Sequence, residues 1–195
     1  MRAGRRWRFV SAVVIVSCLS GACGSPPDKE IEEAEEAIDA AKAASAETYS
    51  KTEFAASTEA LKNAHAAVNE RDYRQALNYA LDAKDRAQTA ARESTERKAT
   101  AKLDADRALR NAALALVDVR ARLKSPQIAR KPARAVAAAR KAAADAEGPV
   151  QEARAAFDRG EYPRVLEMLA GPSARLRDSI RGLGEGDASP PKRGR

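Results

Sequence analysis

Apolar residues recur at steps of three and four along much of the chain, which is the spacing of one face of an α-helix. The stretch from residue 28 to residue 125 contains neither glycine nor proline, so helix can continue there with few forced breaks. Ser25, followed by two prolines and an acid, favours a helix start at this point. The first predicted helix extends to about Ser45. Its apolar stripe is Ile31, Ala34, Ile38 and Ala41.

A second helix is predicted to open at Ser50, because Ser50 and Glu53 have the spacing of a capping box. In that arrangement the serine and the glutamate satisfy each other's exposed amide hydrogens. The helix is expected to close at residues 69–71. Its predicted buried stripe is Phe54, Thr58, Leu61, Ala64 and Val68.

The third predicted helix begins after Asp72, which stands three residues before Gln75, and continues for about 50 residues. At about 1.5 Å per residue such a helix is on the order of 75 Å long. A break at residues 94–98, where the stripe turns polar, stays open. The stripe consists of Leu77, Ala80, Leu81, Ala87, Ala91, Ala105, Ala108, Ala112, Leu116, Val119 and Leu123.

Prolines in the remaining third of the sequence mark the predicted helix ends and breaks. Pro126 and Pro132 end the long helix, and residues 133–158 are predicted as a helix interrupted by a kink or loop at Gly148-Pro149. A last helix starts at Pro163 and is expected to break or kink at Gly171-Pro172. Its apolar positions are Val165, Leu166, Leu169, Leu176 and Ile180.

A loose internal repeat organises these elements. Residues 71–77 and 159–166 each place an acid and a tyrosine at the opening of a helix, about 90 residues apart. The sequence therefore predicts an all-α protein, an elongated antiparallel bundle of two three-helix units that share one long alanine-rich helix. The expected divisions are residues 23–97, residues 98–183, and a disordered basic tail at residues 184–195.

The first 22 residues have the layout of a signal peptide. Positive charges come first, and residues 9–22 are uncharged and mostly apolar. This run of about 14 residues is shorter than the roughly 20 that a membrane-spanning helix needs. The positive charges are Arg2, Arg5, Arg6 and Arg8.

Leu19-Ser20-Gly21-Ala22-Cys23 resembles the bacterial lipobox. The resemblance implies a diacylglycerol on the Cys23 thiol, cleavage just before Cys23, and stable anchoring once two or three acyl chains are attached. Cys18, after Ile15-Val16-Ser17, also fits a lipobox and remains an alternative. The chain contains two cysteines, so a protein cut at Cys23 would keep only the one that carries lipid.

Residues 30–93 resemble the bacterial family known as the domain of unknown function numbered 4398. The resemblance rests on alanine-rich helices, on Tyr49 and Phe54 near the first loop, and on the turn at residues 71–77. That family is typical of envelope lipoproteins, and some members carry an OmpA-like peptidoglycan-binding domain. No such domain is found in these 195 residues, so peptidoglycan binding by that route is in doubt.

The charge is unevenly distributed. Four of the charges behind the formal net value of +7 are the arginines of the signal segment, so a chain cut at Cys23 would carry +3. Residues 30–39 are acidic, whereas a later segment is basic and is predicted to bind a partner. Export favours cell-wall anions or an acidic envelope protein over nucleic acid as that partner. The candidate partner-binding residues are Arg120, Arg122, Lys124, Arg130, Lys131 and Arg134.

Catalytic chemistry is not expected. His65, the only histidine, lies between Leu61 and Val68 and is predicted to pack at the stripe edge. No cofactor, metal or small-molecule substrate is predicted. The predicted function is a non-enzymatic structural or adaptor lipoprotein of the cell envelope, facing the periplasm from the outer membrane in a Gram-negative organism. The alternative is a peptide-binding module of tetratricopeptide type, because residues 71–77 are similar to the turn within such repeats.

Overall fold

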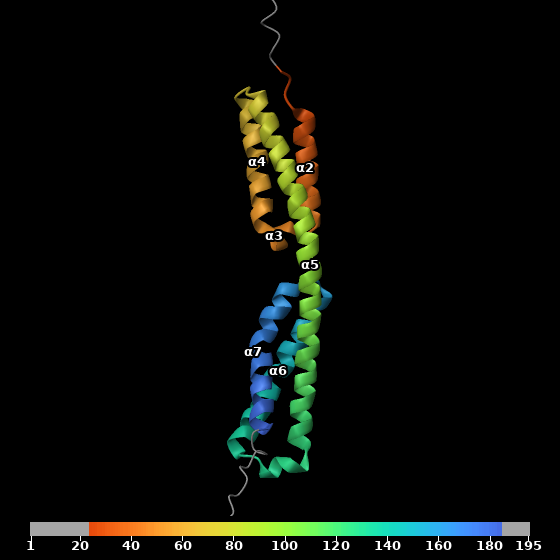
Figure 1. The fold of residues 1–195 in the computed structure, drawn as a ribbon, viewed down its shortest axis with the longest axis vertical. Coiled ribbons are helices and arrows are strands. Elements are labelled where there is room, and N and C mark those ends of the chain that lie inside the picture. Colours follow the sequence, from red (N-terminus) through yellow and green to blue (C-terminus); the bar gives the residue numbers. More distant parts are fainter. Residues whose placement is uncertain (1–23, 185–195) are drawn as a thin grey trace, which may run out of the picture. The chain divides into compact units, whose positions relative to one another are not determined.

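The structure, a computed structural model, describes residues 24–184. This part of the chain is all-α and contains no strand, which confirms the predicted fold class (Figure 1). The elements are α2 (Asp28–Ala43), α3 (Ala46–Tyr49), α4 (Lys51–Asn69), α5 (Tyr73–Lys124), the short 3₁₀-helix η1 (Pro126–Arg130), α6 (Ala133–Asp158) and α7 (Tyr162–Gly184). No helix among the described residues is both long enough and apolar enough to cross a membrane.

The chain divides into two compact units between Thr95 and Glu96. Unit 1 contains α2, α3, α4 and the first part of α5, and unit 2 contains the rest of α5 with η1, α6 and α7. Helix α5 is continuous, without the break considered at residues 94–98. The predicted tail at residues 184–195 begins on Gly184, the last residue of α7, and otherwise lies outside the described residues.

The core of unit 1 is built almost entirely from alanine. Its buried apolar residues are all alanines except Ile31. The predicted stripe of α4 is therefore partly wrong, because its buried face consists of Ser57, Ala60, Ala64 and Ala67, while Thr58 is exposed. Small side chains occupy the buried face of α4 because they let the helices approach closely. The larger Phe54, Leu61 and Val68 lie beside this face and are half-buried.

Two further expectations for unit 1 are wrong. Leu81 belongs to the predicted stripe but is 44% exposed. His65 does not pack at the stripe edge, since half of its side chain is exposed and its Nε2 lies 3.3 Å from Glu35 Oε1. Both residues lie on the outer side of the alanine seam.

The predicted helix starts also differ from the structure. Pro27, rather than Ser25, is the N-cap of α2. Ser50 is the N-cap of α4 but makes no capping hydrogen bond with its side chain. The capping box therefore does not form, and the Ser50 hydroxyl donates instead to Glu93 Oε2 on α5, at 2.7 Å. Asp72 does cap α5, because its Oδ1 accepts a hydrogen bond from the Gln75 amide.

In unit 2, helices α6 and α7 run past their internal prolines. Gly148 and Pro149 lie inside α6, and Pro172 lies inside α7, so neither the loop predicted in α6 nor the break predicted in α7 occurs. A proline in a helix removes one hydrogen bond and crowds the preceding turn. In α6 the buried seam continues at helical spacing on both sides of Pro149, and this packing offsets the local cost. The seam is Ala139, Ala142, Ala143, Ala146, Val150, Ala153 and Ala156.

The turn from α4 to α5 and the turn from α6 to α7 share one backbone geometry. In the first, Arg71 has φ +62° and Asp72 N–H donates to the Ala67 carbonyl. In the second, Gly160 has φ +79° and Glu161 N–H donates to the Ala156 carbonyl. Both are Schellman turns, which close a helix with a left-handed residue. Corresponding residues of the two turns are 89 positions apart, as Tyr73 and Tyr162 are. Helix α4 in unit 1 and helix α6 in unit 2 therefore end in the same way.

Candidate functional site

The proposed lipid acceptor Cys23, its alternative Cys18 and the rest of residues 1–23 lie outside the described residues. Gly24, the residue directly after Cys23, is the first one that the structure describes. Helix α2 begins four residues later, at Asp28. A lipid on Cys23 would therefore be joined to unit 1 by a very short linker.

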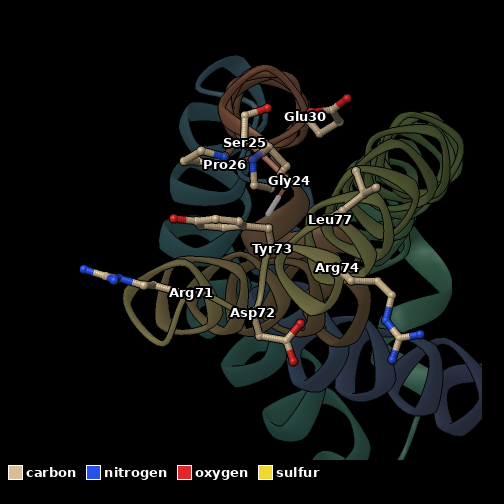
Figure 2. A pocket seen from close by; sticks show the side chains of 10 residues that line it. Gly24, Ser25, Pro26, Glu30, Arg71, Asp72, Tyr73, Arg74 and Leu77 are labelled. Atoms are coloured by element: carbon tan, nitrogen blue, oxygen red, sulfur yellow. The ribbon is translucent and has the colours of Figure 1, made fainter. Parts of the chain in front are cut away.

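A cleft of about 950 Å³ lies beside this start of the described chain. Figure 2 shows Tyr73 next to the Gly24–Pro26 segment, while the side chains of Arg71 and Arg74 point away on opposite sides. The α4–α5 turn thus lies beside the residues that follow Cys23. Any surface that holds Cys23 would also meet this turn.

Two of the six predicted partner-binding residues are neutralised within unit 2. Arg120 on α5 forms an ion pair with Glu147 on α6. The Nε of Arg122 lies 2.9 Å from Oδ1 of Asp118, one turn earlier in α5. Only the Arg120 pair joins two helices of unit 2, but both pairs leave less positive charge for a partner.

The other four predicted residues surround the connection from α5 to α6. Lys124 ends α5, Arg130 ends η1 and Arg134 stands in the first turn of α6; all three are exposed, and none has an ion-pair partner among the described residues. Lys131 is half-buried and lines a small cleft with Leu183 of α7. We call Lys124, Arg130 and Arg134 the basic end of unit 2.

The division of charge between the two units is sharper than the sequence pattern indicated. Residues 24–95 carry nine basic and fifteen acidic side chains, a net charge of −6. Residues 96–184 carry nineteen basic and eleven acidic side chains, a net charge of +8. An anionic partner is therefore attracted to unit 2 and repelled by unit 1.

An ion pair joins helices α2 and α5 of unit 1. The Nζ of Lys84 on α5 donates a hydrogen bond of 2.7 Å to Oε2 of Glu33 on α2. This hydrogen bond, together with the charge of Lys84, lowers the pKa of Glu33, and the same partner raises the pKa of Lys84. Both side chains line a groove of about 700 Å³ between α2 and α5, whose floor includes Ala37, Ala40 and Ala91.

A second groove, of about 430 Å³, lies between α5 and α7 of unit 2, and it was not predicted from the sequence. Leu114 on its α5 side is 67% exposed and Leu166 on its α7 side is 36% exposed. Of the apolar positions noted in the last helix, Leu166 is thus exposed, whereas Val165, Leu169 and Leu176 are buried. The sequence did indicate exposed apolar residues on α5, because Leu103, Leu114 and Val117 do not lie on the predicted apolar stripe of this helix.

No group of three or more histidine, cysteine, aspartate or glutamate side chains within residues 24–184 is placed to hold a metal ion. Comparison with protein-family models, curated proteins and solved structures finds no match to this chain.

Proposed function

We propose that the protein is a lipid-anchored adaptor of the bacterial cell envelope, without catalytic activity of its own. Lipid on Cys23 holds unit 1 against a membrane, and unit 2 binds an anionic envelope component. In a Gram-negative organism the membrane is the outer one, and the protein faces the periplasm.

The observation that carries the proposal is the division of charge between the two units, −6 in residues 24–95 and +8 in residues 96–184. The unit next to the proposed anchor repels anionic polymers, whereas the other unit attracts them. The basic end adds three exposed cations at a single connection, which is where such a polymer or an acidic protein would bind first.

The short linker supports the anchoring half of the proposal. Four residues separate Cys23 from Asp28, and an extended chain spans at most about 3.6 Å per residue. The start of α2 and the neighbouring α4–α5 turn would then lie close to the lipid headgroups. Exposed Arg71 and Arg74 on that turn are compatible with such a surface.

The anchor is tested by expressing Cys23→Ala in bacteria fed an alkyne analogue of palmitate, with Cys18→Ala as the matched control. We expect Cys23→Ala to lose both the label and membrane fractionation, while Cys18→Ala keeps both. The reverse result would make Cys18 the acceptor. Label and membrane association in both variants would contradict lipid anchoring through a single cysteine.

Partner binding is tested separately, by cosedimentation of the purified chain with isolated cell walls. We expect the triple variant Lys124→Glu, Arg130→Glu, Arg134→Glu to lose most of the binding. The control triple variant Lys102→Glu, Arg154→Glu, Arg175→Glu changes the net charge of unit 2 by the same amount at other positions. An equal loss of cell-wall binding in the two triple variants would mean that only the net charge of unit 2 matters, and would contradict a role for the basic end.

A further inference from the structure

The groove between α5 and α7 in unit 2 has an apolar lining that the unit leaves uncovered. Leu114 and Leu166 face it from opposite sides, and small residues, among them Ala108 and Ala170, line the space between them. Exposed leucines are common singly, but two in one groove give it an apolar surface, beside which Asn111, Ser173 and Arg177 also line the groove. Such a surface is typical of a binding site for an apolar side chain.

The corresponding groove in unit 1, between α2 and α5, is bridged by an ion pair. There the Lys84–Glu33 ion pair joins α5 to α2. The 89-residue repeat places Ser173 of α7 at the position equivalent to Lys84, and serine is too short to reach a carboxylate on the neighbouring helix. The two units thus share one architecture, but the Lys84–Glu33 ion pair that bridges the groove of unit 1 has no equivalent at Ser173 in unit 2.

Arg177 gives this groove a positive edge. Its side chain lines the groove, and its Nε donates to the Ser173 carbonyl of the preceding turn at 3.3 Å. No carboxylate among the described residues pairs with Arg177, so its charge remains available to a ligand. The repeat places Gln88 at the equivalent position in unit 1, so this cation is particular to unit 2.

We infer that the α5–α7 groove binds an acidic amphipathic helix of another envelope protein. Leucine-sized side chains at helical spacing would contact Leu114 and Leu166, and a carboxylate on the flank of the ligand would pair with Arg177. Grooves between two helices bind amphipathic helices through apolar residues spaced three and four apart.

The net charge of +8 on unit 2 favours this occupant over the same groove of a second copy of the chain. Two copies that met through this groove would bring two strongly positive units together, which electrostatic repulsion opposes. The same positive charge of unit 2 attracts an acidic helix. The inference rests on the proposed adaptor function and names the class of partner, but its test needs neither the anchor nor the membrane.

The test uses the purified full chain in nonionic detergent and three fluorescein-labelled 18-residue peptides, with micelles alone as the blank. The probe peptide has leucine at steps of three and four, with glutamate and alanine elsewhere. One control peptide replaces each glutamate by lysine, and the other replaces each leucine by alanine. Fluorescence anisotropy measures binding, and we expect only the leucine–glutamate peptide to bind.

Variants of the protein locate the binding surface. We expect Leu114→Asp to raise the Kd of the probe peptide tenfold or more, and Arg177→Glu to raise it several-fold. Leu103→Asp is the matched control, because Leu103 is 64% exposed on the same helix but does not line the groove. We expect Leu103→Asp to change the Kd less than twofold, and circular dichroism checks that all three variants are folded.

Three results would overturn the inference. The first is equal binding of the lysine peptide and the glutamate peptide. The second is an equal effect of Leu103→Asp and Leu114→Asp. The third is a dimer in sedimentation that Leu114→Asp dissociates, because the occupant would then be a second copy. A failure of lipid anchoring at Cys23 would leave peptide binding unchanged, so the two proposals fail separately.

Discussion

Ser50 on the loop before α4 and Glu93 on α5 are joined by a hydrogen bond of 2.7 Å, although 43 residues separate them in sequence. Ser50 is only 1% exposed, so its hydroxyl has little access to water. A buried hydroxyl that donates to a carboxylate contributes more than an average hydrogen bond. Ser50 therefore ties the start of α4 to α5.

Replacing Ser50 by alanine is expected to lower the free energy of unfolding by about 1–2 kcal/mol, because a hydrogen bond to a charged group is lost. Urea unfolding followed by circular dichroism measures the change. In a double-mutant cycle, Ser50→Ala and Glu93→Gln should be coupled, whereas Ser50→Ala and Glu53→Gln should be additive. Coupling to Glu53 alone would mean that the capping box forms after all.

The two Schellman turns predict opposite effects of glycine substitutions. Arg71 has φ +62°, a conformation that costs a residue with a Cβ about 1 kcal/mol, so Arg71→Gly is expected to stabilise the chain by about 0.5–1 kcal/mol. Gly160→Ala should destabilise it by about 1 kcal/mol, for conformational reasons alone, because no atom lies within 4 Å of the added Cβ.

Urea midpoints of Arg71→Gly, Gly160→Ala and the unchanged chain provide the measurement. Arg74→Gly is a control for the loss of an arginine at the same turn, and it should destabilise, since Arg74 lies inside the first turn of α5. If Arg71→Gly destabilises as well, the left-handed conformation of Arg71 would be without energetic consequence.

The Glu33–Lys84 pair predicts a dependence of stability on pH. Lys84 holds the pKa of Glu33 below its ordinary value, so the ionised carboxylate favours the folded state. This contribution is fully present above the unfolded pKa of about 4.3 and is lost as the pH falls through the lower folded pKa. Lys84, whose pKa is raised, loses its contribution only at alkaline pH, above its ordinary value.

Glu33→Gln should therefore be less stable than the unchanged chain at pH 7, and the difference should shrink as the pH falls below about 4. Glu32→Gln, the neighbouring exposed acid, serves as the control and should show a much smaller difference. Thermal unfolding at a series of pH values checks this. A difference for Glu33→Gln that is constant from pH 7 to pH 3 would contradict the role assigned to the pair.

Pro149 offers a test of why α6 stays continuous. If packing of the alanine seam offsets the missing hydrogen bond, Pro149→Ala should restore that bond and stabilise unit 2 by about 1–2 kcal/mol. Pro172→Ala should gain less, because Pro172 is buried in α7 and its replacement also removes contacts. Urea unfolding compares the two variants, and equal gains would argue against this account.

Much of this architecture is predictable from the sequence, and the reasons are local. The spacing of apolar residues and the freedom from proline before Pro126 predict α5 almost to the residue. The turns at Arg71 and Gly160 are signalled by the acid–tyrosine pairs that follow them. Such features depend on neighbouring residues, which a sequence displays directly.

The errors share a different cause, because they depend on residues that are distant in sequence. Ser50 bonds to Glu93 rather than to Glu53 because the fold brings α5 beside the start of α4. Pro149 does not break α6 because the seam on both sides of it is buried against other helices. Likewise, the α5–α7 groove forms only where these two helices bring Leu114 and Leu166 to the same cleft, which neither helix alone reveals.

The continuity of α5 has a consequence for how the protein unfolds. Residues 73–95 of this helix are packed in unit 1 and residues 96–124 in unit 2, without an interruption between them. Helix formation is cooperative, so melting one unit exposes a fraying helix end at the border of the other. The two units are therefore expected to melt as thermodynamically linked domains, and a ligand that stabilises unit 2 would also protect unit 1 from denaturation.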